Sequence, residues 1–180
     1  MALIKAYWYR LRHDYSSLEL EQLHNELFQC LLQGLSMDLL ESFVEPFMRE
    51  CILANLYFPA FQELRLSQHC GNYTVIMSSS PSFLVRRVAE ALGVDQWVAT
   101  EYELDESHRL AGVQNFIDGQ AKARALLELA EKSNVPLEQV SAYSDSYRDL
   151  PLMRLAGQPV AVNPDAKLLT HSLEHRWRIL

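Results

Sequence analysis

The sequence predicts an α/β protein in which a run of helices precedes a mostly parallel β-sheet. From residue 57 onward, short apolar runs typical of buried strands alternate with amphipathic stretches typical of helices. Before residue 57, apolar residues recur at helical spacing and no run indicates a strand. Strands that alternate with helices form βαβ units, and their right-handed crossovers make neighbouring strands parallel. We therefore divide the chain into a helical segment, residues 1–56, and an α/β core, residues 57–180.

Two helices are expected in the N-terminal segment. Ser16 and Glu19 have the spacing of a capping box, and a helical apolar face follows and ends at Gly34. That face consists of Leu20, Leu23, Leu27, Leu31 and Leu32. Ser36 is the expected N-cap of a second helix, which runs to about Ala54 and is kinked or divided at Pro46. The residues expected to face inward from it are Leu39, Leu40, Phe43, Phe47 and Cys51.

The α/β core is expected to contain four strands, a hairpin and five helices. The strands are short apolar runs at residues 73–77, 96–100, 140–143 and 159–162. The helices are residues 60–68, 81–92, 120–133 and 150–155, and a last helix that starts near residue 165. Ser80 as N-cap, with Pro81 at the first helical position, is a strong helix start. Residues 101–117 alternate around a polar turn and predict a β-hairpin.

Composition and charge exclude several classes of function. The net charge of −7 and the lack of a basic stripe argue against a nucleic-acid-binding protein. The three cysteines, Cys30, Cys51 and Cys70, form no C-x-x-C pair, so a zinc knuckle or a dithiol redox motif is not expected. An odd cysteine count without a secretory leader indicates a reducing, cytoplasmic setting. The N-terminal apolar stretch is too short and too charged to span a membrane.

Polar side chains that suit a phosphate group and a hard metal ion follow the predicted strands. Ser78 follows the first strand, Lys122 lies in the first turn of a helix, and Asp145 and Asp149 follow the strand at 140–143. Open α/β sheets bind ligands at the carboxyl ends of their strands. A hydroxyl and an ammonium donate to phosphate oxygens, and carboxylates bind Mg²⁺. Taken singly, these residues also fit helix caps and solvated surface positions.

The segments VIMSSSPSFLVRRVAEALGVDQWVAT and VSAYSDSYRDLPLMRLAGQPVAVNPD resemble the haloacid dehalogenase (HAD) superfamily, in its phosphoserine-phosphatase-like branch, subfamily IB. The resemblance covers residues 57–180 and implies a Rossmann-like core; the helices before it are similar to part of that branch's helical cap. It implies Mg²⁺-dependent hydrolysis of a small phosphorylated metabolite through an aspartyl-phosphate. By the same resemblance, Ser78 hydrogen-bonds the phosphoryl group, Lys122 neutralises its charge, Asp145 binds Mg²⁺, and Asp149 supports the metal shell.

The chain departs from the family pattern in two places. The family usually has Gly-Asp-Ser where this chain has Ser144-Asp145-Ser146, and a serine for the glycine reduces the backbone freedom of that loop. The family's nucleophile and its general acid–base are two aspartates spaced D-x-D after the first, central strand, and no two aspartates of this sequence have that spacing. We therefore expect the first central strand to be missing between the strands that end at Ser78 and at Tyr143.

A missing central strand has three expected outcomes. The flanking strands close up on each other, another chain supplies a strand, or the fold is marginal, because the lost interactions approach a domain's whole stability of about 5–15 kcal/mol. An unpaired strand edge also invites self-association.

Three functions are weighed: a HAD phosphatase, an inactive HAD module that binds phosphate or a partner, and a receiver-like phosphoacceptor, which the motif order disfavours. For this chain, inactivity is favoured over turnover, because losing a covalent nucleophile is far worse than losing a supporting hydrogen bond.

His171 and His175 are four residues apart on the last helix, but no third metal ligand is evident in the sequence.

Overall fold

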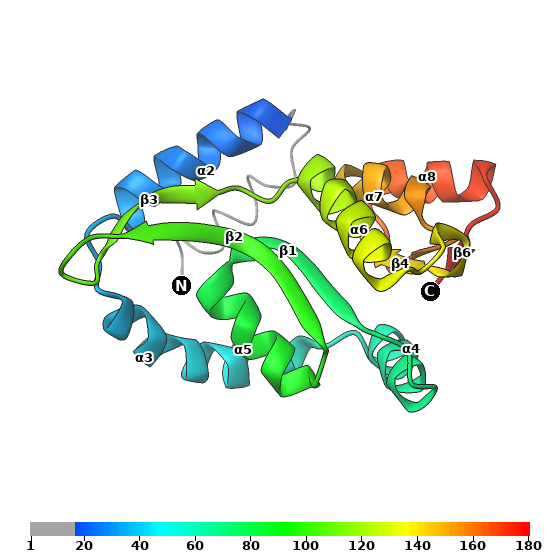
Figure 1. Ribbon diagram of the computed structural model, residues 1–180, viewed down its shortest axis with the longest axis horizontal. Coiled ribbons are helices and arrows are strands. Elements are labelled where there is room, and N and C mark those ends of the chain that lie inside the picture. The colour runs from blue at the N-terminus through cyan, green and yellow to red at the C-terminus, as the bar shows by residue number, and fades with distance from the viewer. Residues whose placement is uncertain (1–16) are drawn as a thin grey trace.

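A computed structural model, which describes residues 17–180, confirms the α/β class (Figure 1). Its helices are α2 (Ser17–Leu31), α3 (Met37–Phe47), α4 (Phe58–His69), α5 (Ser82–Leu92), α6 (Gly119–Ser133), α7 (Leu150–Leu155) and α8 (Ala166–Glu174). Its strands are β1 (Val75–Pro81), β2 (Gln96–Leu104), β3 (Leu110–Asn115), β4 (Ser141–Ser144), β5 (Gln158–Ala161) and β6 (Arg178–Ile179). A π-helical turn at Met48–Ile52 and 3₁₀ turns at Leu53–Asn55, Leu137–Gln139 and Tyr147–Asp149 complete the described elements.

The strands of residues 17–180 form two three-stranded sheets. In the first, β1 runs parallel to β2, and β2 and β3 form the predicted antiparallel hairpin. In the second, β4, β5 and β6 are all parallel, with Ser141 beside Gln158 and Val160 beside Arg178. Parallel pairing therefore predominates, as predicted. β6 was not predicted, because a two-residue strand is too short to show a pattern in the sequence.

The two sheets do not pair with each other: within residues 17–180, β1 pairs only with β2, and β4 only with β5 (Figure 1). The expectation that the flanking strands close up on each other is therefore wrong. Each strand finds its partner within its own sheet: β1 pairs with β2, and β4 with β5. Helix α4, which precedes β1, is hydrogen-bonded to the second sheet, because its Glu63 accepts from Arg178 Nη1 (2.9 Å) and Tyr143 Oη (3.2 Å).

The N-terminal helices pack on the first sheet. The chain between α2 and α3 pairs with the end of the hairpin, where Gly34 N donates to Leu110 O (2.8 Å) and Met37 N donates to His108 O (3.0 Å). Helix α2 lies along β3, α5 covers β1 and β2, and α3 lies beside α5 (Figure 1). The division of the chain at residue 56 stays a prediction.

The buried faces of α2 and α3 differ in part from the predicted ones. Ser36 caps α3 as predicted, because its Oγ accepts from Leu39 N (3.3 Å), and the π-helical turn after Phe47 provides the join expected near Pro46. Leu39 and Phe43 are 45% and 63% exposed, so their predicted burial is wrong. The buried side chains are Leu20, His24 and Phe28 on α2, and Val44 and Met48 on α3 and the π-helical turn. The reason is that, within residues 17–180, α3 packs mainly against α5 and buries a narrow stripe. The expected cap at Ser16 lies outside the described residues.

The start of α5 also differs from the prediction. β1 continues to Pro81, which is the N-cap of α5, so the assignment of Ser80 as the N-cap is wrong. The reason is a contact across the sheet: the buried Thr100 donates through Oγ1 to Ser79 O (2.9 Å) and keeps this segment extended. Ser78 consequently lies inside β1 and not after it.

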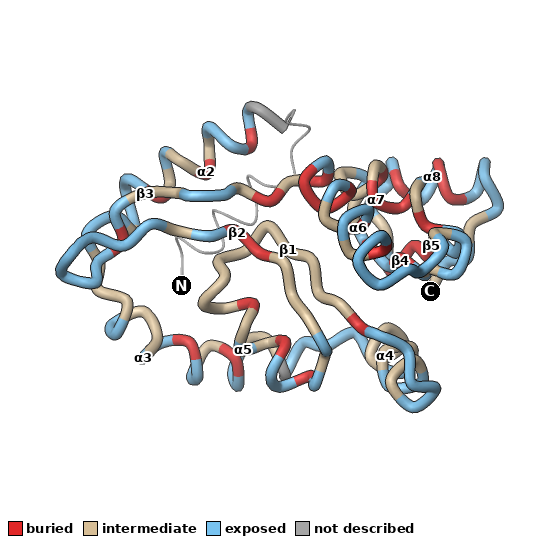
Figure 2. Tube along the Cα trace, in the orientation of Figure 1, coloured by how far each residue is buried: buried red, intermediate tan, exposed pale blue. Residues whose placement is uncertain are grey.

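Buried side chains gather in the half of the molecule that contains α6, α7, β4 and β5 (Figure 2). Met153, Ala161 and Leu168 are fully buried there. Among the described residues, no helix is both long and apolar enough to cross a bilayer.

Candidate active site

A buried ion pair between Lys122 and Asp149 forms the centre of the candidate site. Lys122 Nζ lies 2.7 Å from Asp149 Oδ1 and 2.9 Å from Oδ2, and the two side chains are only 9% and 14% exposed. Lys122 belongs to the first turn of α6, where the helix dipole disfavours a positive charge. The carboxylate compensates this charge, so the unusual position of the lysine has an electrostatic explanation. The residues come from two elements that the sequence separates by 27 positions.

Ser144 extends the pair into a small network that sequence reasoning did not identify. Its hydroxyl donates to Asp149 Oδ2 (2.8 Å) and accepts from Ser146 N (3.1 Å). Ser144 is the last residue of β4 and stands where the family usually has glycine. The hydroxyl thus fixes both the orientation of Asp149 and the turn of the acidic loop. The sequence does contain a signal for Ser144: it is a short polar residue at the end of a predicted strand, five positions before Asp149.

The first turn of α6 packs directly against the loop that carries Asp149. A Cβ built on Gly119 would overlap the carbonyl oxygen of Arg148, so only glycine allows this approach. Asp118 caps the helix, because its Oδ1 accepts from Ala121 N at 2.7 Å. The cap by Asp118 and the close approach at Gly119 together place Lys122 at Asp149.

Asp145 lies in the same loop but faces solvent. The residue is exposed, and its carboxylate forms no hydrogen bond with residues 17–180. The loop around it is anchored by Asp165, whose Oδ2 accepts from Tyr147 N (2.8 Å) and whose Oδ1 accepts from Leu168 N (2.9 Å). Asp165 N in turn donates to Asp145 O at 2.8 Å. Within the described part of the chain, the carboxylate oxygens of Asp145 are thus unengaged and stand on a fixed backbone, which suits a hard cation.

Ser78 lies on the other sheet. It is half-buried in β1, and its Oγ accepts from Ser80 N at 3.1 Å. Thr100 holds the neighbouring backbone, because its Oγ1 also accepts from Ile117 N (3.2 Å) in the segment that leads to α6. Of the four predicted site residues, the structure brings Lys122 and Asp149 into contact and places Asp145 in the same loop. Among the described residues, the Ser78 hydroxyl is hydrogen-bonded within its own strand.

Glu63, Tyr143 and Arg178 form a clamp that joins α4 to the second sheet, and the pKa values of these residues are shifted. The hydrogen bond from Arg178 lowers the pKa of Glu63, which stays a carboxylate, and burial, together with the nearby Glu63 charge, raises the pKa of Tyr143. Tyr143 immediately precedes Ser144, so the clamp also fixes the strand that carries the acidic loop.

Chemically, the arrangement combines a held ammonium group with a solvent-facing carboxylate. An ammonium can neutralise phosphate oxygens, and a carboxylate can hold Mg²⁺ beside them. The side chains of the described residues at this site match that donor set.

Comparison with known proteins gives an independent line of evidence. A family model for haloacid dehalogenase-like hydrolase matches residues 2–154. The chain is 32% identical over 152 residues to an "inhibition of morphological differentiation protein" of Streptomyces azureus, covering 84% of this chain and 55% of that protein. It is 30% identical over 152 residues to a histidinol-phosphatase of Neisseria meningitidis, covering 81% and 68%. The chain spans about half the length of several curated relatives it matches, such as 49% of a phosphoserine phosphatase of Mycobacterium tuberculosis.

Solved structures share the fold. A protein with unknown function from Bordetella pertussis superposes with a TM-score of 0.80 at 22% identity, over 99% of this chain and 79% of that one. A probable phosphoserine phosphatase from Vibrio cholerae superposes with a TM-score of 0.66 at 20% identity, over 94% and 49%.

Proposed function

Because this chain belongs to the haloacid dehalogenase-like hydrolase family, we propose that it forms the lysine-and-metal half of a Mg²⁺-dependent phosphomonoesterase site. The observation that supports this most directly is the buried pair of Lys122 with Asp149, next to the exposed Asp145. A buried ammonium group in the first turn of a helix is costly unless it serves an anion. Asp149 is that anion in the structure, and a phosphate oxygen would be a second anionic partner of the same ammonium group.

Each residue has a distinct role in this proposal. Asp145, whose carboxylate is free and exposed, binds Mg²⁺, which supplies positive charge to the phosphate oxygens when it is bound. Both carboxylate oxygens of Asp149 accept hydrogen bonds from Lys122 Nζ, so Asp149 orients the lysine. It also supports the residues around the metal ion. Ser144 keeps Asp149 in that orientation. Ser78 donates its hydroxyl to the phosphoryl group once β1 is held beside β4.

The chemical step needs groups that this sequence does not contain. The family resemblance implies an aspartyl-phosphate formed on the first aspartate of a D-x-D pair, and no such pair is present in the 180 residues. We therefore expect Mg²⁺ and phosphate binding by this chain, and no turnover unless such a pair is provided from outside these residues. The substrate class is a small phosphomonoester, as the names of the phosphatase relatives suggest.

The test compares binding and turnover in the same preparation. Isothermal titration with Mg²⁺ and inorganic phosphate is expected to show binding that Asp145→Asn weakens for Mg²⁺ and Lys122→Met weakens for phosphate. Hydrolysis of p-nitrophenyl phosphate with Mg²⁺ is expected to stay at the buffer rate. If neither variant changes binding, the proposed site is wrong. If the chain hydrolyses the ester and Asp145→Asn stops it, the chain carries its own nucleophile and the half-site proposal fails.

A second candidate function is a non-catalytic HAD module that binds a partner. The unpaired edges of β1 and β4 within residues 17–180 favour it, because exposed strand edges recruit further strands. Self-association through these edges is expected to appear as a concentration-dependent mass in light scattering. A mass that stays at the monomer value over the whole concentration range would argue against it.

A further inference from the structure

The C-terminal end of α8 carries a second cluster of potential metal ligands, separate from the acidic loop. His171, Glu174 and His175 follow the spacing H-x-x-E-H on the last turn of the helix, and their ligand atoms lie within 4.8 Å of one another. Residues three and four apart lie on one face of a helix. The His175 ring is stacked on that of His171 with centroids 3.9 Å apart, so the exposed His175 side chain has to turn for the three ligand atoms to reach a common point. Glu174 supplies the third ligand that was not evident from the histidine pair alone.

Each of the two imidazoles has a ring nitrogen without a hydrogen-bond partner among the described residues. His175 Nδ1 lies 2.9 Å from His171 O, so the imidazole donates there and its Nε2 keeps the lone pair. Metal-binding histidines commonly donate their other ring nitrogen to a backbone carbonyl in this way. His171 is only 7% exposed, and its Nε2 is buried without a hydrogen-bond partner among the described residues. A buried imidazole nitrogen without a partner is unfavourable unless a ligand binds it.

The surroundings leave room for an ion. An open depression of about 520 Å³ is lined by Tyr147, Ala166, Lys167, Thr170, His171 and Glu174, so two of the three ligands border it and His175 lies just outside it. Ligand atoms bound to one Zn²⁺ lie about 3–4 Å from each other, because each bond is roughly 2.0–2.2 Å long. Glu174 and His175 are exposed, so their side chains can move to that spacing. The Glu174 carboxylate offsets part of the cation's charge.

We propose that His171, Glu174 and His175 bind a first-row transition metal of the Zn²⁺ class at the end of α8. Two imidazoles and one carboxylate suit Zn²⁺, Ni²⁺, Co²⁺ and Cu²⁺, and not Mg²⁺, which prefers oxygen ligands alone. Three protein ligands leave a coordination position open to solvent. Its three ligands are distinct from the proposed Mg²⁺ ligand Asp145 in the loop after β4, although Tyr147 of that loop meets the His171 ring edge-on.

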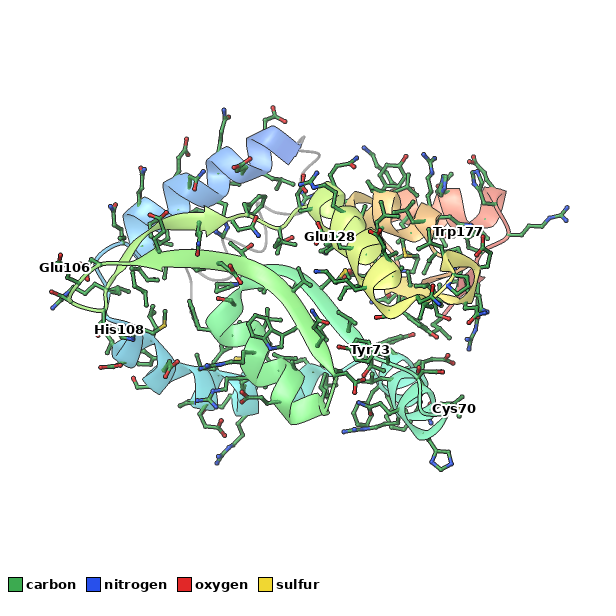
Figure 3. The ribbon with its side chains drawn as sticks, in the orientation of Figure 1. Cys70, Tyr73, Glu106, His108, Glu128 and Trp177 are labelled. Atoms are coloured by element: carbon green, nitrogen blue, oxygen red, sulfur yellow. The ribbon has the colours of Figure 1, made fainter. Side chains whose placement is uncertain are left out.

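Trp177 provides a built-in reporter for this site. Its ring meets that of His171 edge-on, with centroids 4.9 Å apart, and Figure 3 shows it at the same end of the molecule. A paramagnetic ion held by His171 is therefore expected to quench Trp177 fluorescence. Replacing Trp177 by Phe is expected to remove the quenching without removing the metal.

The experiment is a Co²⁺ titration of the tag-free, EDTA-treated, full 180-residue chain, followed by visible absorption and tryptophan fluorescence. A single saturable site is expected, which Zn²⁺ displaces and excess Mg²⁺ does not. Glu174→Gln and His175→Ala, both at exposed positions, each alter a direct ligand and are expected to weaken binding by about 10-fold or more, because losing a residue that only hydrogen-bonds a ligand already costs roughly 10–100-fold. His69→Ala, at the exposed end of α4, and Asp145→Asn are the matched controls and are expected to bind Co²⁺ unchanged.

Three results would overturn the proposal: no saturable Co²⁺ binding by the folded chain, binding unchanged by His175→Ala and by Glu174→Gln, or binding abolished by Asp145→Asn. Circular dichroism of each variant establishes that it is folded. Because the readouts are metal affinity and fluorescence, the result does not depend on phosphatase activity.

Discussion

The Lys122–Asp149 pair is predicted to be a large single contribution to the stability of the second half of the molecule. Asp149→Ala removes the partner of an ammonium group whose side chain is 9% exposed, together with a hydrogen bond from Ser144 (2.8 Å). Breaking a buried ion pair by removing one partner costs about 3–5 kcal/mol, because the remaining charge stays buried and uncompensated. Since a domain is stable by about 5–15 kcal/mol in total, this loss is about a fifth of the stability or more.

The assay is equilibrium unfolding in urea, followed by tryptophan fluorescence. The matched control is Glu45→Ala, which breaks an ion pair with Arg49 whose side chains are 73% and 77% exposed, and which is expected to cost under about 1 kcal/mol. The double variant Lys122→Met/Asp149→Leu removes both charges and is expected to recover most of the loss, since no charge stays buried. If Asp149→Ala costs no more than Glu45→Ala, the reasoning from burial is refuted.

Three further perturbations have definite expected outcomes. Burial lowers the pKa of His24 from 6.5 to about 4, so between these pH values the unfolded chain binds a proton that the folded chain does not. The free energy of unfolding should therefore fall by about 3 kcal/mol as pH drops from 6.5 to 4. Urea unfolding of His24→Phe at several pH values should show a flatter pH dependence. Gly119→Ala places a Cβ against the Arg148 carbonyl and should lower the thermal midpoint, together with phosphate affinity; an unchanged midpoint would contradict the close approach. Glu63→Gln should cost no more than about 1 kcal/mol, because Arg178 is half-exposed, but should speed amide hydrogen exchange in β6; unchanged exchange would argue against a clamp there.

Local signals in the sequence predicted those elements whose ends depend on nearby residues. The short helix α7 was predicted with its observed bounds, because Pro151 favours its first turn and Gly157 follows its end. The hairpin of β2 and β3 followed from alternation around a polar turn. The site residues Lys122 and Asp149 could be predicted to meet, because the carboxyl ends of parallel strands and the helices that follow them share one edge of a sheet.

Features that depend on contacts far apart in the sequence could not be predicted from local pattern. The extension of β1 to Pro81 depends on Thr100, whose hydroxyl holds Ser79 from another strand. The burial of α3 depends on which helix lies against it, so its apolar pattern alone selected Leu39 and Phe43 wrongly. The role of Gly119 is visible only when Arg148 is placed beside it.

The separation of the two sheets divides the proposed site into a part that is already assembled and a part that is not. Lys122, Ser144, Asp145 and Asp149 belong to the second sheet and its helices, and hydrogen bonds within that half hold Lys122, Ser144 and Asp149 together. Ser78 lies on the first sheet, and among the described strands nothing fixes β1 beside β4. In this chain alone, Lys122→Met should therefore weaken phosphate binding strongly, whereas Ser78→Ala should change it little. Equal losses in the two variants would mean that the sheets come together around phosphate, and that the ligand itself assembles the site.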